Sequence, residues 1–311
     1  MPDLAVLILT YNEERHIGRA LAALRGVARE VFIIDSYSTD RTVEIAKASG
    51  AVVLEHTFVN QAKQFEWGLE NAPITAAWVL RLDADEVLTS ELSEEICGVL
   101  PQLPPEVTGV NLHRRHIFLD RWIRHGGRYP LTLLRLWRRG AARIERRWMD
   151  EHMVLRYGRA ITFEHDFADY NINDLTYFTE KHNKYATREA IDVLMKRYRL
   201  GERDETLTKE SVSLQASAKR WMKVRVYNRM PFWLGPALYF AYRYFLRFGF
   251  LDGSEGLTYH LLQGFWYRFL VGAKVLEFDR VLKSLRDEET RLAELARLSG
   301  YKLGDLKGGL S

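Results

Sequence analysis

The sequence has 311 residues, enough for one large domain or two modest ones. Hydrophobic residues make up 47% and charged residues 28%, a balance that argues against wholesale disorder. A single cysteine, Cys97, excludes an internal disulfide and a cysteine-based zinc site. The net charge of +4 is too small to indicate nucleic-acid binding by itself. No basic segment precedes the apolar run that begins at Leu4, so we expect no cleaved signal peptide.

The first hundred residues alternate between strand and helix patterns. Between the strands, apolar residues recur at helical spacing, and Asn12 and Ser38–Asp40 are expected to cap the first two helices. This order predicts an α/β fold: an open, mostly parallel, twisted sheet flanked by helices. The runs expected to form strands are Leu4–Leu9, Val31–Ile34, Ala51–Leu54 and Trp78–Leu82.

Two common nucleotide-binding motifs are missing from the sequence. No Gly-x-Gly-x-x-Gly follows the first strand, and no Gly-Lys-Ser/Thr loop occurs, which argues against dinucleotide-binding and P-loop proteins. In open α/β sheets, ligands bind beyond the carboxyl ends of the strands. The residues to consider are therefore Thr10–Glu13, Asp35–Ser38 and Asp83–Glu86.

Asp83 and Asp85 are separated by Ala84 directly after the fourth strand. Mg²⁺ and Mn²⁺ prefer carboxylate oxygens and often link one or two of them to substrate phosphates. The alternative is a solvated turn that caps the next helix. After the second strand, Asp35 and Ser36 offer a carboxylate and a hydroxyl to a base or ribose, or they cap the helix that follows.

Three motifs follow one another in the first hundred residues: Ile8–Glu14, Ile33–Thr42 and Leu82–Glu86. In order and spacing they resemble family 2 of the glycosyltransferases, most closely bacterial members that build lipopolysaccharide core, O-antigen or capsular polysaccharide. The resemblance is strong over residues 4 to 100 and looser beyond. It implies a GT-A fold and an inverting transfer from a nucleotide sugar, with UDP as the expected nucleotide and thymidine and guanosine donors left open.

The resemblance also assigns roles to residues of the donor site. Thr10, Tyr11 and Glu13 would line the nucleotide pocket, and Asp35, with Ser36 beside it, would meet the base. Asp83 and Ala84 would lie at the ribose and diphosphate, with Asp83 a second ligand to the divalent metal. Asp85 would be the principal ligand to that Mn²⁺ or Mg²⁺. Lys63 lies where relatives often place a donor contact, although a solvated helix face explains it equally well.

The acceptor side offers candidates for the general base. An inverting transfer is a direct displacement, so the acceptor hydroxyl loses its proton as it attacks. Relatives carry one or two acidic residues near this point, which makes Asp150 or Glu151 the base; an exposed acidic turn is the alternative. His152 or His165 would complete the metal shell or contact the diphosphate, unless they are structural.

The chain is expected to divide functionally at residue 205. Residues 1–205 would form the catalytic domain, with a nucleotide-sugar half at 1–112 and an acceptor half at 113–205. Residues 206–311 would form a helical, aromatic and basic extension. The basic residues from Arg135 to Arg147 are expected either to contact a diphosphate or a charged acceptor, or to lie on a solvated face of a strand.

From Ser211 to Leu251 the chain has seven Lys or Arg, eleven aromatic residues and no Asp or Glu. Cations interleaved with aromatics suit a membrane interface. We therefore expect either peripheral contact with an anionic membrane, where a lipid-linked acceptor would lie, or a helical core that packs on the catalytic domain or a second subunit. The expected location is cytoplasmic or on the inner face of the cytoplasmic membrane.

Three kinds of protein could carry these features. An inverting sugar transferase that acts on a cell-surface glycan precursor accounts for all three motifs. A sugar-nucleotide pyrophosphorylase would need a glycine-rich basic loop where Tyr11–Glu14 stands. A non-catalytic nucleic-acid-binding protein leaves Asp83 and Asp85 unexplained, and an acidic cleft repels nucleic acid. We therefore expect no nucleic-acid partner.

Overall fold

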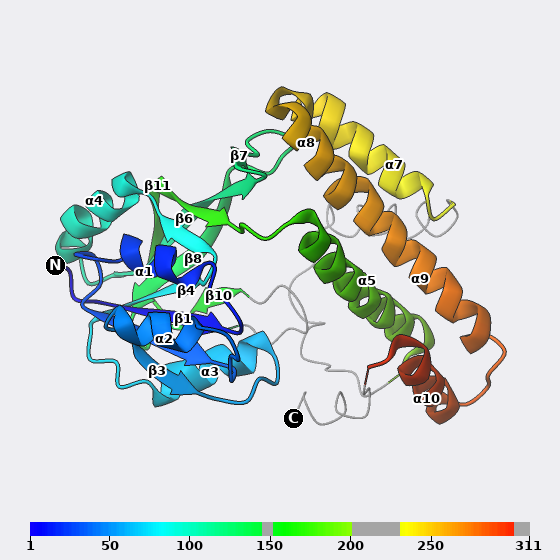
Figure 1. The fold of residues 1–311 in the computed structure, drawn as a ribbon, viewed down its shortest axis with the longest axis horizontal. Coiled ribbons are helices and arrows are strands. Elements are labelled where there is room, and N and C mark those ends of the chain that lie inside the picture. Colours follow the sequence, from blue (N-terminus) through cyan, green and yellow to red (C-terminus); the bar gives the residue numbers. More distant parts are fainter. Residues whose placement is uncertain (145–151, 201–230, 302–311) are drawn as a thin grey trace. The chain divides into compact units, whose positions relative to one another are not determined.

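The computed structural model describes residues 1–144, 152–200 and 231–301 (Figure 1). The chain forms two compact units, Met1–Ile172 and Asn173–Ser311. The first unit contains the β-sheet, and the described part of the second is helical.

The first half of the sheet has the predicted strands and direction. Strands β1 (Leu4–Thr10), β2 (Glu30–Asp35), β3 (Val52–Glu55) and β4 (Trp78–Asp83) lie in the order β3-β2-β1-β4, and all pairs are parallel. The connecting helices are α1 (Ile17–Ala23), α2 (Thr42–Ala48) and α3 (Gln61–Asn71). The carboxyl ends of β1, β2 and β4 therefore meet at one edge.

The second half of the sheet is mixed in direction. It continues from β4 in the order β8-β6-β11-β5, with β8 and β5 antiparallel to their neighbours and β6 parallel to β11. The short strands β9 and β10 form a separate antiparallel pair, and β7 pairs with the end of β6. The bounds are β5 (Glu86–Leu88), α4 (Ser90–Val99), η1 (Leu100–Gln102), β6 (Val107–Phe118), β7 (Arg121–Trp122), β8 (Leu131–Arg138), β9 (Ala142–Ile144), β10 (Met153–Leu155) and β11 (Arg159–Tyr170).

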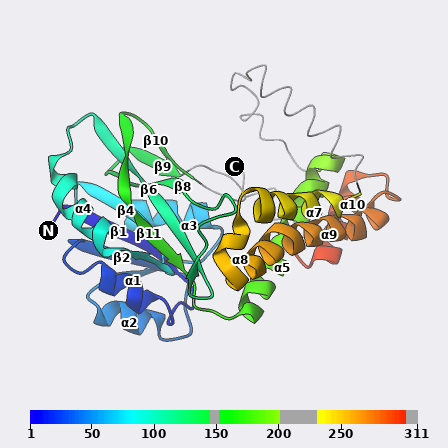
Figure 2. The ribbon, with the colours of Figure 1, turned by 90° about the horizontal axis from the view of Figure 1, so that it is seen from above.

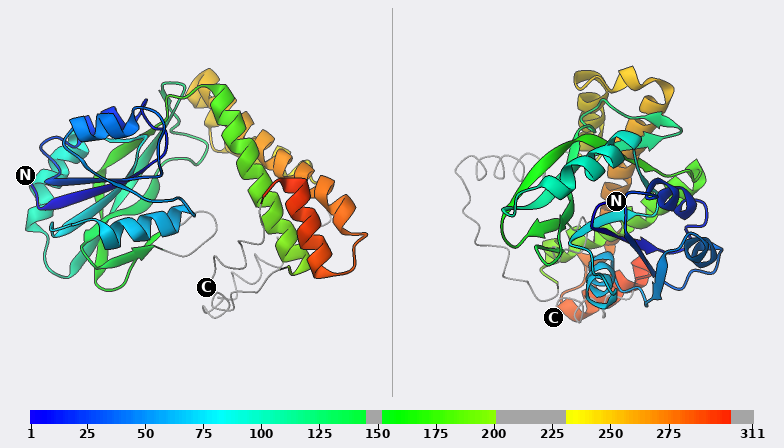
Figure 3. Two further views of the ribbon diagram at one scale, coloured as in Figure 1. Left: turned by 60° about the horizontal axis from the view of Figure 1, so that its bottom comes forward. Right: turned by 90° about the vertical axis from the view of Figure 1, so that its left-hand side faces the viewer.

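Both faces of the parallel half are buried, as the unbroken apolar runs predict. Leu4, Val6 and Ile8 point into one cluster with α1 and α4, and Ala5 and Leu7 point into another with α3. Figure 3 shows the helices on both sides of the sheet. A core of this kind fixes the strand ends, and so the position of the residues that follow them.

The predicted cap of the first helix was wrong. Helix α1 begins at Ile17, and its N-cap, His16, makes no side-chain capping bond. Asn12 instead has a left-handed backbone (φ 55°), and its side-chain oxygen accepts from the N–H of Thr39 at 2.8 Å. Residues 11–14 therefore belong to the edge of the sheet and not to the helix.

The second unit is built on a separate apolar cluster. Helix α5 (Leu175–Tyr198) is capped by Asp174 and packs on α9 and α10 (Figure 2). No helix in residues 1–144, 152–200 or 231–301 is both long and apolar enough to span a membrane. The remaining elements are α7 (Leu234–Ala241), η3 (Tyr242–Leu246), η4 (Gly249–Asp252), α8 (Gly253–Tyr259), η5 (His260–Trp266), α9 (Tyr267–Leu282) and α10 (Glu288–Ser299).

The boundary between the compact units differs from the functional boundary expected at residue 205. Helix α5 belongs with the C-terminal helices, because Ala186, Ala190 and Leu194 are buried in their cluster together with Phe278 and Leu282. The division of function between residues 1–205 and 206–311 stays a prediction.

Two helical glycines give a matched test of the packing behind β1 and β2. A Cβ on Gly68 would lie 2.7 Å from Ile34 Cγ1 and 3.1 Å from Leu7 Cδ2, whereas a Cβ on Gly98 would meet nothing within 4 Å. We expect Gly68→Ala to lower the free energy of unfolding by about 1–3 kcal/mol. Gly98→Ala should raise it by up to about 1 kcal/mol, because alanine favours the helix. Urea unfolding measures both, and equal stability of the two variants would contradict this packing.

Candidate donor and metal site

Three of the predicted residues lie together at the carboxyl edge of the sheet. Thr10 is the register partner of Asp35, and Leu9 is the partner of Asp83. The ends of β1, β2 and β4 therefore bring the first, second and third motifs to neighbouring positions. Each of these residues was selected from the sequence because it stands at or just after the carboxyl end of an expected strand.

Asp35 organises the loop that follows β2. Its side chain is fully buried and accepts from Thr10 Oγ1 at 2.7 Å, Ser38 N at 2.7 Å and Ser38 Oγ at 2.6 Å. A buried carboxylate needs such donors, because leaving it without partners is costly. Its predicted contact with a nucleotide base stays a prediction, and the structure adds a second role as the support of this loop.

The loops after β1 and β2 are joined by further hydrogen bonds. The N–H of Asn12 donates to Ser38 Oγ at 2.8 Å, and that of Glu13 donates to Thr42 Oγ1 at 2.7 Å. Tyr37 adopts a left-handed backbone (φ 59°). In the loops joined in this way, the side chain of Tyr11 is 60% exposed and that of Tyr37 is 55% exposed. Two aromatic rings at a ligand-binding edge are available to pack on a base or sugar; Tyr37 was not singled out from the sequence.

The carboxylate of Glu13 is engaged within the same loop. It lies 2.7 Å from His16 Nδ1, and His16 Nε2 accepts from the N–H of Ile172 at 3.1 Å. Because Nε2 accepts, Nδ1 carries the proton that is donated to Glu13. The pair therefore ties the end of the first unit to the loop that holds Tyr11.

Ser36 and Lys63 lie on adjoining elements. Gln64 Nε2 donates to Ser36 Oγ at 3.1 Å and to the carbonyl of His56 at 3.0 Å. Lys63 is in the first turn of α3, where its N–H donates to the capping side chain of Asn60. The start of α3 is therefore fixed beside the end of β2, and Lys63 is half-buried there.

The Asp83-Ala84-Asp85 turn has the burial pattern that a metal site needs. Ala84 is 4% exposed and packs in the core, whereas the side chain of Asp83 is 35% exposed and Asp85 is half-buried. Asp85 is held by residues at the end of β11. Its side chain accepts from Asn171 Nδ2 at 2.9 Å, and its carbonyl accepts from Tyr170 N. Both carboxylates therefore remain accessible at the end of β4.

A buried group of charges lies beneath this turn. Glu86 Oε2 accepts from the N–H of Asp83 at 2.8 Å, and Glu86 Oε1 accepts from Arg135 Nη2 at 2.6 Å. The same Arg135 nitrogen lies 3.6 Å from Asp83 Oδ2, and Arg81 Nε lies 3.9 Å from Asp83 Oδ1. Glu86 and Arg135 are almost fully buried.

These charges determine the ionisation of the turn. Burial opposes ionisation of Asp83, but Arg135 and Arg81 outweigh it and hold the pKa of that carboxyl below its usual value. Burial, with Asp83 and Asp169 nearby, raises the pKa of Glu86, and the guanidinium of Arg135 opposes this rise. Asp83 is therefore anionic at neutral pH, as a candidate metal ligand must be.

The donor set fits a hard divalent cation shared with a substrate. In the described parts of the chain, no three or more His, Cys, Asp and Glu side chains are grouped to hold a metal ion. Mg²⁺ and Mn²⁺ need no such cage when one or two carboxylates and substrate phosphates complete the shell. The accessible carboxylates of Asp83 and Asp85 offer that kind of partial shell.

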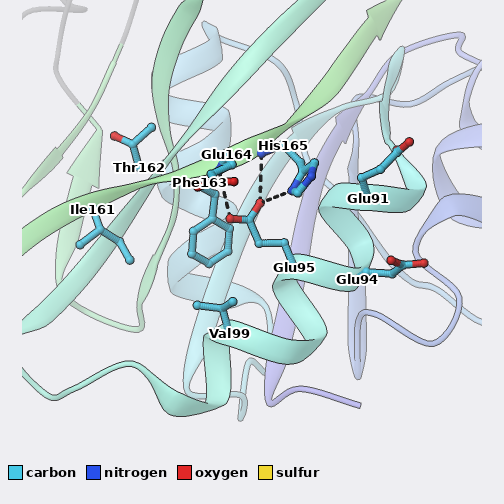
Figure 4. A pocket seen from close by; sticks show the side chains of 9 residues that line it. All are labelled: Glu91, Glu94, Glu95, Val99, Ile161, Thr162, Phe163, Glu164 and His165. Carbon is cyan, nitrogen blue, oxygen red and sulfur yellow. Dashed lines mark hydrogen bonds and ion pairs between the residues drawn. The ribbon is translucent and has the colours of Figure 1, made fainter.

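His165 lies in a different environment from the turn. It lies on β11 four residues before Asp169, roughly 13 Å along a strand at about 3.3 Å per residue. Its Nδ1 is 2.9 Å from Glu95 Oε2 on α4, in the pocket of Figure 4, where the same carboxylate also accepts from the N–H groups of Glu164 and His165. Glu95 raises the pKa of His165. Its role as a metal ligand stays a prediction that this placement does not support.

The predicted bases cannot be placed. Asp150 and Glu151 lie outside the described residues, and His152, the next residue, is exposed just before β10. Both base assignments stay predictions.

Two arginines from the predicted basic zone have structural roles. Arg135 pairs with Glu86, and Arg138 donates to the carbonyls of Val107 and Leu103 while its guanidinium lies over Trp78. These roles have no signal in the sequence, because a buried arginine and a solvated one look alike in a strand of mixed pattern. Asp169 on β11 was missed for the same reason.

Substitution of Arg135 and Glu86, singly and together, tests how much this buried pair contributes to stability. Arg135→Met leaves Glu86 buried without its cation, and we expect it to lower the free energy of unfolding by about 3–5 kcal/mol. Glu86→Leu should also be costly, since it strands Arg135. The double variant should regain most of the loss, because both charges leave together. Urea unfolding of the four proteins gives the coupling energy, and simple additivity would mean that the pair is not coupled.

Comparison with known proteins agrees with the geometry of this edge. The family model described as "Glycosyl transferase family 2" matches residues 5–169, which is more than half of the chain. Among curated proteins, an uncharacterized glycosyltransferase of Rickettsia typhi is 38% identical over 96 residues, or 31% of this chain and 32% of that protein. The glycosyltransferase SunS of Bacillus subtilis (strain 168) is 30% identical over 102 residues, or 32% of this chain and 24% of SunS. The match thus spans about a third or less of these relatives.

Among solved structures, glucosyl-3-phosphoglycerate synthase from Mycobacterium tuberculosis, crystallised with Mn²⁺, UDP and glucosyl-3-phosphoglycerate, is 19% identical. The alignment covers 36% of this chain and 43% of that one with a TM-score of 0.30, too low to support an inference about this chain. The fold is α/β with an open sheet between helices and a helical C-terminal region, as the GT-A resemblance predicted. The family match extends from β1 into β11 and includes Thr10, Asp35, Asp83 and Asp85, so the chain belongs to glycosyl transferase family 2.

Proposed function

We propose that the protein is an inverting glycosyltransferase that moves a sugar from a nucleotide-sugar donor, expected to be UDP-linked, to a hydroxyl of a glycan or lipid-linked acceptor. The observation that carries this proposal is the accessible carboxylate pair Asp83 and Asp85 at the end of β4, next to the loops that follow β1 and β2. Cell-surface polysaccharide synthesis is the setting suggested by the resemblance in the sequence.

The edge of the sheet supports binding of the nucleotide part of the donor. Tyr11 and Tyr37 expose rings there, and Ser36 offers a hydroxyl beside them. Asp35 and Thr10 hold the underlying loop rigid, which keeps the rings in place before the ligand arrives. Such pre-organisation lowers the entropy cost of binding.

A divalent ion would be held by Asp85 and Asp83, and it would supply positive charge against the diphosphate that leaves. The chain itself contributes the fixed position of the turn. Glu86 and Arg135 hold Asp83 from below, and Asn171 holds Asp85 from the side. A rigid turn of this kind costs little reorganisation when the ligand binds.

The reaction would proceed by direct displacement. The acceptor oxygen forms a bond to the anomeric carbon as the bond from that carbon to the diphosphate oxygen breaks, and the hydroxyl proton passes to a carboxylate. We propose Asp150 or Glu151 for that carboxylate, on the resemblance in the sequence. Alignment of donor and acceptor at the edge of the sheet would supply several kcal/mol of the rate enhancement.

The alternative functions find less support at this site. The loop of residues 11–14 is closed by hydrogen bonds from Asn12 and Glu13 to the loop after β2, unlike the glycine-rich basic loop that a pyrophosphorylase would need. The accessible acidic pair at the edge would repel a nucleic acid.

A surface of the second unit supports contact with a membrane. In the segment Phe245–Leu251, which runs from the end of η3 into η4, the side chains of Phe245, Leu246, Phe248 and Leu251 are between 53% and 70% exposed. Arg247 among them is exposed as well, and the sequence from 231 to 251 holds no Asp or Glu. Adjacent large apolar side chains on a surface mark an interaction site, and a cation among them suits anionic headgroups. Residues 211–230 of the basic and aromatic segment lie outside the described residues, and Phe240 and Tyr244 stack on each other.

Substitution of Asp85 tests the proposed function. Asp85→Ala should abolish the gain in thermal stability that UDP gives in the presence of Mn²⁺, because the diphosphate loses its link to the protein. A ligand at about 100 times its dissociation constant should raise stability by about 2.7 kcal/mol in the unaltered protein. The fold should persist, because Asp85 is only half-buried and does not belong to the apolar core. An undiminished shift in the variant, or in EDTA, would contradict the metal assignment.

The base variants give the matching control in the same assay. Asp150→Asn and Glu151→Gln, made separately, should both keep the UDP-dependent shift. One of them should lose most sugar transfer, because only the proton acceptor is gone. Mild and equal losses would move the base elsewhere in the chain.

Vesicle flotation tests the membrane contact. The full chain should float with phosphatidylglycerol-containing vesicles and less with phosphatidylcholine alone. Phe245→Ser with Leu246→Ser should weaken binding about tenfold or more, since each buried apolar side chain contributes about 1.5–3 kcal/mol. Val52→Ser with Val99→Ser removes comparably exposed side chains from the first unit and should change nothing. If the two double variants float to the same extent, or if the unaltered chain does not float with any vesicle, the segment Phe245–Leu251 does not bind membranes.

A further inference from the structure

The loop between β3 and α3, residues 56–60, lies at the edge of the sheet that carries the donor site. Strand β3 is parallel to β2, and Glu55 at its end is the register partner of Asp35. The chain stays beside β2 for one more residue, because the N–H of His56 donates to the carbonyl of Asp35 at 2.9 Å. The loop therefore begins next to the one that exposes Tyr37.

Both ends of this loop are anchored to α3. At one end, His56 Nδ1 lies 2.8 Å from Gln64 Oε1, and the His56 ring stacks on Trp67 with 4.3 Å between the ring centroids. At the other end, the side chain of Asn60 accepts from the N–H of Lys63 at 2.8 Å and caps the helix. The short stretch between these anchors is therefore restricted in the conformations that it can adopt.

This restricted stretch presents two large apolar side chains to solvent. Phe58 is 53% exposed and Val59 is 59% exposed. Single exposed apolar residues are common on protein surfaces and need no explanation, whereas a group of them marks an interaction site. Since the exposed rings of Tyr11 and Tyr37 stand on the loops after β1 and β2, three neighbouring loops of one edge carry such side chains.

The buried state of Asp35 makes these exposed side chains the first contacts of a ligand at this end of the edge. Its carboxylate is fully buried and already accepts from Thr10 Oγ1 and from two donors of Ser38. A ligand that lies over the ends of β2 and β3 therefore meets flat aromatic and apolar surfaces before it meets a charge. Such surfaces suit the face of a planar ring.

The order of the strands indicates which part of the donor lies there. Neighbouring strands are about 4.8 Å apart, so in the order β3-β2-β1-β4 the ends of β3 and β4 are separated by roughly 14 Å. In a nucleotide sugar, the base and the sugar lie at opposite ends of the molecule, with the diphosphate next to the sugar. Because the diphosphate is proposed to lie at Asp83 and Asp85, on β4, the base points towards β2 and β3 and the acceptor approaches from the other end.

We propose that Phe58 and Val59 form an apolar wall of the donor site that packs on the face of the nucleobase. Aromatic side chains pack well on any base, because every base has a π-face. The inference rests on the proposed function, and it adds two residues that determine how tightly the donor is held. Neither of them belongs to the three motifs of the sequence.

Calorimetric titration of the full chain with UDP, at saturating Mg²⁺, tests this wall. Phe58→Ala with Val59→Ser should raise the dissociation constant about tenfold or more, because the packing on the base is lost. Phe58→Tyr keeps the ring and should stay within about twofold of the unaltered chain. Val52→Ser with Val99→Ser removes exposed side chains from the opposite end of β3 and from α4, and it should leave the affinity unchanged.

Saturation-transfer NMR of bound UDP shows which part of the nucleotide the wall contacts. In the unaltered chain, the two ring protons of uracil should receive strong saturation from the protein. In the Phe58→Ala, Val59→Ser variant, their saturation should fall relative to that of the ribose protons. A general disturbance of the fold would instead weaken both sets of signals together.

Three results would overturn the wall and leave the glycosyltransferase proposal standing. These are full UDP affinity in the Phe58→Ala, Val59→Ser variant, an equally large loss with Phe58→Tyr, and a parallel fall of the uracil and ribose signals. An unaltered chain that binds none of UDP, dTDP and GDP would contradict the proposed function, and the wall with it.

Discussion

A buried carboxylate, that of Glu86, accepts the N–H of Asp83 and the guanidinium of Arg135, and the rest of the candidate site depends on it. These two bonds set the direction in which the chain leaves β4, and therefore where Asp83 and Asp85 stand. Arg135 also lowers the pKa of Asp83, so one buried pair fixes both the geometry and the charge of the turn. A buried ion pair is a poor source of stability but a good source of specificity in such a place.

A buried carboxylate also supports the loop that follows β2. Asp35, fully buried, accepts from Thr10 and Ser38 and thereby shapes the loop that exposes Tyr37. In both places a polar group inside the protein holds a ligand-facing residue at the surface. The chemistry proposed for this edge relies on groups that are in position before the donor binds, and satisfied buried networks are what provide that rigidity.

The sequence by itself determined the parallel half of the sheet and the residues at its edge, because apolar runs of strand length and the residues that follow them are local signals. Thr10, Asp35, Asp83 and Asp85 were found in this way. Only the tertiary structure could decide that Arg135 is buried against Glu86, since a charged side chain carries no local mark of its burial. Its partner stands 49 residues away in the chain, and the two meet only when antiparallel strands join the sheet.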